Sequence, residues 1–589
     1  MAAGLHRAEP TGLHHADYIV IVGYFVLLSA IGVYFWKRMR NTRDLFTGGN
    51  TIPWWLAGVS FYLTGFSALS FVMYTEMAYK HGLVAVTQAW SAAAAMAIGT
   101  KFLAAKWRRA RIVSPVEFLE ARYNKHIRQI IAWTGIPLRI IDDGLKIYAT
   151  GLFVSLGMGL DLQASILLCA GVMLLYTFMG GLWAVVITDY VQFIILTLGV
   201  VVLFPLVFSA AGGFSVLTAE TAPGFLSPIN EPYSLLYVFA FYLLITLSYN
   251  GSWAFAQKFL CTRNEAEARK AGYLATALKI IGPPLFILPA MAAPTLLPAI
   301  AAKDTYATLA LTYLPAGLMG LMIAAMFSAT MSTLSGDYNA VASVITQDIY
   351  ARIFDKHASE KRLVWVGRLA TLLVGTLAAS IGIAIMATAQ RSLFDVMVTV
   401  FTVFTGPMLI PFLAGLLTRR VTSFAAGAGI VTGLVSGISF FIYDTWLRTG
   451  TTGGLDFKAI AILVNYSVTI VAMAVAGWLE RPDEDRRRKI AAFFDQLERP
   501  IEPVTPGASG GAAPFSPMPV IGWVTIGTGI LLLTSVPAQP GGAGRLITLA
   551  VAVVLVAIGG SFHWLRKRSD RAVIPTAVAR FSSSAEVDQ

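Results

Sequence analysis

Long apolar segments recur along the whole chain, and they restrict it to a helical membrane fold. About 15 segments stay apolar over roughly 20 residues, the length that an α-helix needs to cross a hydrocarbon core of about 30 Å. Because 56% of the 589 residues are hydrophobic and only 13% are charged, we expect an all-α polytopic membrane protein. The predicted spans are 17–36, 53–78, 83–105, 129–158, 163–182, 187–211, 233–257, 270–298, 312–346, 364–387, 394–417, 421–443, 457–478, 519–536 and 544–565.

The basic residues fall in alternate loops between these spans. Taken alone, a net charge of +12 would also fit a nucleic-acid-binding protein. However, the charges gather on one side when the spans are threaded alternately, as in Lys37 to Arg40, Lys106 to Arg109, Lys258 with Arg263, and Arg486 to Lys489. The positive-inside rule therefore predicts a multi-pass protein of the cell (inner) membrane with its N-terminus outside and its C-terminus in the cytoplasm. No nucleic-acid partner is expected.

The sequence gives little support to an enzyme. Cys169 and Cys261 are the only cysteines, so no disulfide framework or metal cluster is expected. All seven histidines fall at termini, in loops or at the ends of spans, where they would not hold a metal at depth. The chain also lacks the Gly-x-x-x-x-Gly-Lys-Ser/Thr loop that a nucleotide-driven pump would use.

A run of hydroxyls and one carboxylate interrupts the apolar span 312–346. It reads Ala329-Thr-Met-Ser332-Thr333-Leu-Ser335-Gly-Asp337-Tyr-Asn339. Lipid offers such groups no hydrogen-bond partner, so the run is expected to face protein, water or an ion. Positions 329, 332, 333 and 336 share one helical face, and two neutral hydroxyls with freed backbone carbonyls suit a small hard cation. The simpler alternative is that the hydroxyls bond back to carbonyls of their own helix.

Two other spans carry polar interruptions at mid-depth. Span 53–78 contains Thr64-Gly65-Phe66-Ser67, and span 233–257 contains Ser248-Tyr249-Asn250-Gly251-Ser252. They lie five spans apart, and an odd number of crossings makes any five-helix repeat recur upside down. Paired broken helices in inverted halves are typical of the binding site of a secondary transporter. Packing of small residues between helices is the alternative.

The span 129–158 contains an unusual group of charges, Arg139-Ile-Ile-Asp142-Asp143-Gly-Leu-Lys146. The spacing predicts two intrahelical ion pairs, Arg139 with Asp143 and Asp142 with Lys146. Charges inside a membrane are functional candidates by default, although a self-neutralised packing cluster is an equally simple interpretation. If the group is functional, it suggests a zwitterionic or charged organic substrate.

Three stretches carry a resemblance to a known family: Pro53-Trp54-Trp55 with Ser67 and Ala68, the run from Gly180-Gly181-Leu182 to Thr188-Asp189 and Gln192, and the run from Ala329 to Tyr350; Gln257 through Lys279 adds a fourth. In these stretches the chain resembles the sodium:solute symporter family. The resemblance implies a leucine-transporter-type fold with two inverted five-helix repeats, one N-terminal span and about four C-terminal spans. The implied divisions are 1–50 (tail and first span), 51–212 and 213–420 (the repeats), 421–500 (two spans and a cytoplasmic surface helix), 501–518 (linker) and 519–589 (two spans and a cytoplasmic tail).

The resemblance also implies a sodium site. Its positions are the backbone carbonyls of Leu63 and Phe66 and, from the later helix, Ala329, Ser332 and Thr333. Some relatives hold a second sodium ion. Asp189, Ser332 and Ser335 match that site, but Gly336 lacks a further hydroxyl and leaves it in doubt. Asp189 equally well reads as a cap for free amides at the start of its span.

The implied solute pocket is less well defined. Where sugar-transporting members carry acidic and amide side chains, this chain has Leu69, Ser70 and Ala89, so a hexose bound in that manner would lack hydrogen-bond partners. The candidate pocket residues are Ser67, Ser70, Gln88, Asp142, Asp143, Lys146, Tyr249, Asn250, Ser252, Lys279 and Thr399.

Together these features predict sodium-coupled uptake of a small organic solute by alternating access, with Na+ as the coupling ion. Two alternatives remain at this point: a membrane sensor derived from a transporter, and a proton-coupled transporter of the same fold. The identity of the solute, the number of sodium ions, the role of the two last spans and the oligomeric state stay open.

Overall fold

The computed structural model describes residues 13–36, 42–215, 217, 223–387, 393–447, 454–480, 484–501, 516–539 and 542–584. Helices dominate this part of the chain, and its β-structure is limited to two isolated bridges. The elements of the first half are α1 (His15–Trp36), α2 (Thr42–Thr47), η2 (Gly48–Asn50), α3 (Trp54–Thr64), α4 (Ala68–His81), α5 (Val84–Phe102), α6 (Ala104–Ala110), α7 (Phe118–Arg122), α8 (Lys125–Met158), α9 (Leu162–Ala210), α11 (Leu235–Asn250), α12 (Trp253–Leu260), α13 (Glu265–Met291) and α14 (Ala293–Leu296). Those of the second half are η3 (Ala302–Asp304), α15 (Thr305–Tyr313), α16 (Leu318–Val344), η4 (Ile345–Phe354), α17 (Glu360–Ala387), α18 (Leu393–Leu417), α19 (Ser423–Ile442), η5 (Tyr443–Leu447), α20 (Gly454–Leu479), α21 (Glu484–Glu498), α22 (Met518–Leu533), η6 (Val536–Ala538) and α23 (Ala543–Ser584).

Most of the predicted spans coincide with described helices. Nine described helices are long and apolar enough to cross a membrane, and the number rises to 12 if each of three sharply bent pairs is one span. The prediction of about 15 spans is higher, since it also counts α5, which is rich in alanine and carries Lys101, and α22, which has 16 residues. In addition, the two predicted spans 163–182 and 187–211 lie within one helix, α9, of which Leu182–Ala210 is long and apolar enough to cross a membrane by itself.

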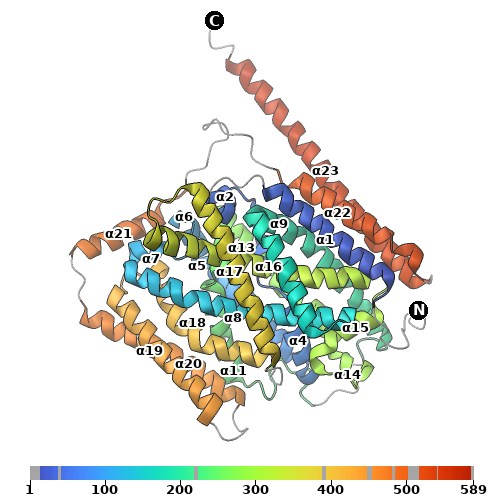
Figure 1. Ribbon diagram of the computed structural model, residues 1–589, viewed down its shortest axis with the longest axis horizontal. Helices are drawn as coiled ribbons and strands as arrows, with labels where there is room; N and C mark the ends of the chain where they lie inside the picture. The colour runs from blue at the N-terminus through green and yellow to red at the C-terminus, as the bar shows by residue number, and fades with distance from the viewer. Residues whose placement is uncertain are drawn as a thin grey trace.

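α16 forms the centre of the molecule (Figure 1). It packs against α1, α3, α8, α9, α12 and α17, and every residue from Leu318 to Val344 is buried. A helix buried on all sides can carry polar side chains, because protein groups rather than lipid then surround them. The polar run from Ala329 to Asn339 lies within this helix and continues toward η4, a π-helical stretch.

Two broken helices lie beside α16. α3 and α4 bend by 55° where Gly65, Phe66 and Ser67 separate them, and α11 and α12 bend by 52° at the break between Asn250 and Trp253. Ser67 adopts an extended conformation, and the Ser252 hydroxyl accepts a hydrogen bond from the Phe255 amide to begin α12. Both interruptions therefore expose main-chain groups inside the bundle, as the sequence predicted.

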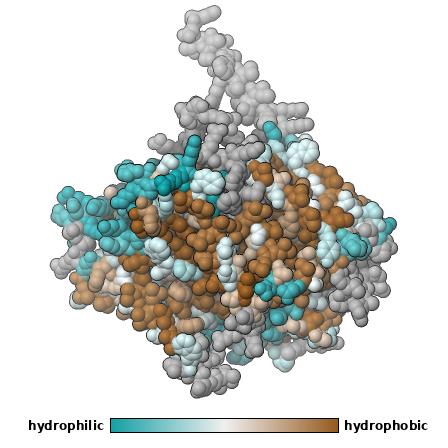
Figure 2. Space-filling model, in the orientation of Figure 1, coloured by the Kyte–Doolittle hydropathy of each residue, from teal (hydrophilic) through white to brown (hydrophobic). Residues whose placement is uncertain are grey.

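The molecule has one strongly polar end. Figure 2 shows a broad hydrophobic surface with a hydrophilic region at the upper left, over α6, α7 and α21. The amphipathic α21 buries Ile490, Phe493, Phe494 and Leu497 while its charged residues face outward. Arg109 joins Glu265 at 2.9 Å in the same region. The predicted surface helix 480–498 thus corresponds to α21, packed on α6 and α7.

The terminal helices form a separate layer. α22 pairs with α23 and packs against α1 and α9. Gly23 of α1 lies so close to Leu531 that a Cβ there would come within 2.6 Å of Leu531 Cδ1. Gln539 donates to the Ala316 carbonyl at 2.5 Å and so ties this layer to the start of α16. Most of the predicted linker 501–518 lies outside the described residues.

Candidate functional site

Backbone and side-chain oxygens converge where the break between α3 and α4 meets α16. The Thr333 hydroxyl lies 3.2 Å from each of three carbonyl oxygens, those of Leu63, Phe66 and Ala329. A hydroxyl has one proton to donate, so it cannot satisfy three acceptors at once. The arrangement leaves a compact group of electron-rich oxygens, which is the chemistry that a small hard cation requires.

The neighbouring hydroxyl of Ser332 extends this group. It is buried and lies close to the Asp189 carboxyl, to which it can donate a hydrogen bond. A hydroxyl that donates its proton keeps its lone pairs, so the Ser332 oxygen could still bind a cation at this point. Ser335 differs, because its hydroxyl already donates to the Ser332 carbonyl at 3.0 Å.

Asp189 lies in a buried polar chain rather than at a helix start. Ser60 of α3 donates to its carboxylate, and Lys258 of α12 donates to Ser60 at 2.8 Å. The Lys258 ammonium lies 3.9 Å from the Asp189 carboxylate, and all three side chains are fully buried. The interpretation of Asp189 as a cap is wrong, since it lies well inside α9. Lys258, expected among the loop charges, belongs to the core.

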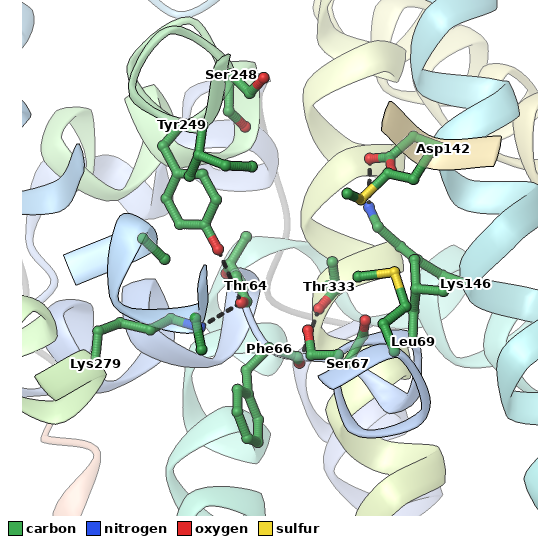
Figure 3. A pocket seen from close by; sticks show the side chains of 18 of the residues that line it. Thr64, Phe66, Ser67, Leu69, Asp142, Lys146, Ser248, Tyr249, Lys279 and Thr333 are labelled. Carbon is green, nitrogen blue, oxygen red and sulfur yellow. Dashed lines mark hydrogen bonds and ion pairs between the residues drawn. The ribbon is translucent and has the colours of Figure 1, made fainter. Parts of the chain in front are cut away.

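A cavity that is partly open to solvent lies next to this group of oxygens, and its empty space, including the open part, is about 900 Å³. Both broken helices line it, together with α5, α8, α13, α16 and α18. Figure 3 shows Lys279 and Tyr249 on one side, the Asp142 and Lys146 pair on the other, and Thr333 between them. Seven of the predicted pocket residues line this cavity: Ser67, Ser70, Asp142, Lys146, Tyr249, Ser252 and Lys279.

Four other candidates lie outside the cavity lining. Asp143 is fully buried behind Lys146. Gln88 is also fully buried, while the Asn250 amide donates to the Ala95 and Thr246 carbonyls. Thr399 accepts a hydrogen bond from Lys458 at 3.0 Å and lines a separate, smaller pocket.

The charged group on α8 is arranged differently from the prediction. Lys146 joins three carboxylates: Asp142 at 2.9 Å, Asp143 at 3.0 Å and Asp337 of α16 at 2.7 Å. The pairing of Asp142 with Lys146 is confirmed. Among the ion pairs of the described residues, however, none joins Arg139 to Asp143. Lys146 forms ion pairs with both Asp142 and Asp143 from one position. Arg139 lines the cavity rather than pairing with Asp143.

Lys279 of α13 reaches the break between α3 and α4 from the opposite side. Its ammonium donates to the Gly65 carbonyl and lies 5.1 Å and 4.8 Å from the ring centroids of Tyr62 and Phe66. Aromatic faces and a carbonyl oxygen are favourable neighbours for a buried cation. The Tyr249 hydroxyl donates to the same carbonyl at 3.2 Å.

Sequence reasoning missed three participants, Ser60, Lys258 and Tyr62. The only signal for Lys258 was its place one residue beyond the predicted span 233–257, which suggested a loop. Nothing in the local pattern around Ser60 or Tyr62 distinguishes them from packing residues, because their partners come from distant helices.

Comparisons with known proteins agree with this geometry. The family described as the sodium:solute symporter family matches residues 45–433. Over 456 residues the chain is 27% identical to a sodium/sialic acid symporter of Proteus mirabilis, which covers 72% of this chain and 91% of that protein. Over 473 residues it is 28% identical to a sodium/glucose cotransporter of Vibrio parahaemolyticus, covering 73% of this chain and 85% of that protein.

A solved structure shares the fold. It is the substrate-bound, outward-open state of a Na+-coupled sialic acid symporter, and it aligns with a TM-score of 0.69 and 24% identity. The alignment covers 80% of this chain and 99% of that one. The predicted all-α, leucine-transporter-type fold is thereby confirmed, while the arrangement in two inverted repeats stays a prediction.

Proposed function

Because this chain belongs to the sodium:solute symporter family, we propose that its coupling ion binds between the break of α3 and α4 and the polar face of α16. The chain is a multi-pass membrane protein and a sodium-coupled symporter of small solutes. The proposed sodium ligands are the carbonyls of Leu63, Phe66 and Ala329 and the hydroxyls of Ser332 and Thr333. The sensor and proton-coupled alternatives are not favoured, since the related proteins are sodium symporters.

One observation carries the proposed site: a single hydroxyl, that of Thr333, faces three carbonyl oxygens at 3.2 Å. A bound sodium ion would satisfy all of them and could also take the lone pairs of the Ser332 hydroxyl. The oxygens come from two elements, the broken helix and α16. An ion between them would hold these elements together, and its loss would let them separate.

This link explains how sodium and solute can be coupled. The residues on the other side of the break, Gly65 and Ser67, line the solute cavity. Sodium binding would order the break and so complete the cavity wall. Solute binding would then no longer have to supply the free energy of ordering the break. Opening of the other side of the membrane would then release both, in an alternating-access cycle.

The topology belongs to the same proposal. We place the N-terminus outside and the C-terminus in the cytoplasm of the cell's inner membrane, with α6, α7 and α21 on the cytoplasmic side. The two broken pairs, α3 with α4 and α11 with α12, would be equivalent elements of two inverted repeats over 51–212 and 213–420. Their bends of 55° and 52° support that equivalence.

We further propose that Asp189 pairs with Lys258 rather than with a second sodium ion. Lys258 already supplies a positive charge at 3.9 Å from the carboxylate. Ser335 also donates its hydroxyl to its own helix. Sodium dependence with a Hill coefficient of about 1 would agree with a single ion.

Sodium binding can be tested without knowing the solute. Purified protein is titrated with sodium chloride against potassium chloride at constant ionic strength, and bound radiolabelled sodium is measured. Thr333→Val and Ser332→Ala each remove one ligand, and the loss of roughly 1–3 kcal/mol should raise the half-saturating sodium concentration between about fivefold and about 150-fold. Ser343→Ala is the matched control, because that hydroxyl lies on α16 but bonds to Ala340. Unchanged affinity in both ligand variants would refute the assigned site.

A further inference from the structure

The walls of the solute cavity carry opposite charges. Lys279 lies on the wall formed by α13, and no ion pair of the described residues includes it. Lys279 is 3% exposed, and its ammonium has the Gly65 carbonyl as its hydrogen-bond acceptor, with Tyr62 and Phe66 as aromatic neighbours. These contacts stabilise a cation without neutralising it. The ammonium can therefore accept an anionic partner from a bound solute.

The facing wall is acidic. Lys146 binds Asp142, Asp143 and Asp337, so one ammonium is shared by three carboxylates. Arg139 lines the same cavity and contributes the second positive charge on this wall. Counted by formal charge, the three carboxylates and two cations sum to −1, with Asp143 lying behind the lining. Figure 3 shows that Asp142 lies across the cavity from Lys279.

The cavity as a whole is therefore neutral but dipolar. A solute with a net charge would leave an uncompensated charge in a site of low polarity, which is unfavourable. A nonionic polyol would satisfy neither wall.

The lining also contains uncharged polar and apolar side chains. Leu69, Met73, Ile245, Met397 and Phe401 lie between the charged walls. These side chains suit a short hydrocarbon skeleton that keeps two ionic groups apart.

We infer that the transported solute is a small zwitterion, with its carboxylate paired to Lys279 and its ammonium or quaternary ammonium group facing Asp142. This inference rests on the proposed function, because it assigns a substrate class to the same cavity. It also gives the charged group on α8 a role in selecting the solute.

The test uses purified full-length protein and its thermal stability in sodium chloride and in potassium chloride. The probes are small amino acids and betaines, each with its amide, which carries only the positive charge, and its deaminated acid, which carries only the negative charge. Hexoses complete the panel. Stabilisation in sodium by one or more zwitterions, at concentrations about tenfold below those of their singly charged analogues, is the expected result. Stabilisation by a hexose or a singly charged analogue in preference to every zwitterion, or by no zwitterion, would overturn the inference.

Two charge variants sharpen the test. Lys279→Met makes the cavity net negative and should shift the preference about tenfold toward the amide. Asp142→Asn makes it net positive and should shift the preference toward the deaminated acid. Thr276→Val is the control on α13, since its hydroxyl bonds only to Gly272 of the same helix. Unaltered selectivity in both charge variants would overturn the inference.

The sodium response of the solute-free protein distinguishes a wrong substrate class from a wrong cation site. It shows that each variant is folded and that the cation site works. If that response persists while zwitterions fail to bind, the substrate class is wrong and the proposed function stands. If the solute-free wild-type protein does not respond to sodium, the cation site itself is wrong.

Discussion

Lys258 illustrates how much one buried side chain can matter in this bundle. Its ammonium, the Ser60 hydroxyl and the Asp189 carboxylate connect α12, α3 and α9 without contact with solvent. A buried ion pair adds little stability compared with an apolar pair, but the removal of one partner leaves an uncompensated charge.

Lys258→Met should therefore destabilise the protein by about 3–5 kcal/mol, because it leaves the Asp189 carboxylate buried and unpaired. The double variant Lys258→Met/Asp189→Asn removes both charges and should recover much of that loss. Midpoints of denaturant unfolding in detergent, followed by tryptophan fluorescence, measure both effects. A double variant whose loss equals the sum of the two single losses would mean that these charges do not interact.

For single residues, the local sequence pattern predicted some contacts and not others. The proposed sodium ligands were inferred from the family resemblance, and the ion pair of Asp142 with Lys146 was predicted from helical spacing. Asp337 as the third partner of Lys146 did not, because it comes from α16 and no rule of local spacing connects the two helices. The expected pair of Arg139 with Asp143 failed for the same reason: distant contacts decide which of several acceptable partners a charge takes.

Among the elements, α8 and η4, which follows α16, are joined by several polar contacts. Arg128 donates to Asp348 at 2.5 Å and forms an ion pair with Glu120 at 2.5 Å. Ser114 donates to the same Asp348 carboxylate, and Gln129 donates to its carbonyl at 2.6 Å. These contacts hold Asp348 of η4, a stretch in which the π-helical pattern widens the helix. π-Helical stretches frequently lie at functional sites.

Arg128→Met should loosen this junction, because Asp348 would lose its buried cationic partner. We expect faster hydrogen exchange in peptides that cover 345–354. Arg352→Met is the control, since Arg352 meets Glu120 at 3.4 Å with 54% of its side chain exposed, and exposed pairs contribute less than about 1 kcal/mol. Equal exchange in the two variants would show that the network does not hold η4.

Element types were easier to predict than their limits. Both broken helices were predicted from polar residues at mid-depth, because such residues have few other uses in a membrane. The continuity of α9 and the π-helical form of η4 were not predicted. Both depend on packing against neighbouring helices, which the local sequence does not encode.

For the whole molecule, α9 is the element on which the topology depends. A straight helix of 49 residues would be about 74 Å long, more than twice the hydrocarbon core. The proposed orientation requires this segment to cross twice, so that the residues before and after it lie on the same side. If α9 crosses the membrane only once, every later loop lies on the opposite side of the membrane from the one proposed.

Single introduced cysteines test this directly, because both native cysteines are buried. Leu160→Cys and Phe214→Cys precede and follow α9 at exposed positions, and Asp485→Cys lies on exposed α21. A membrane-impermeant maleimide should label the first two in intact cells and the third only after permeabilisation. Labelling of only one of the α9 pair would show a single crossing.

The layer of α1, α22 and α23 has a consequence for how the protein is made. α1 is synthesised about 500 residues before α22, and the close approach of Gly23 to Leu531 joins the two helices. While the residues between them are synthesised, α1 therefore waits in the bilayer with the face that contacts α22 uncovered. Until α22 is inserted, an insertion factor or a lipid would have to cover this face of α1.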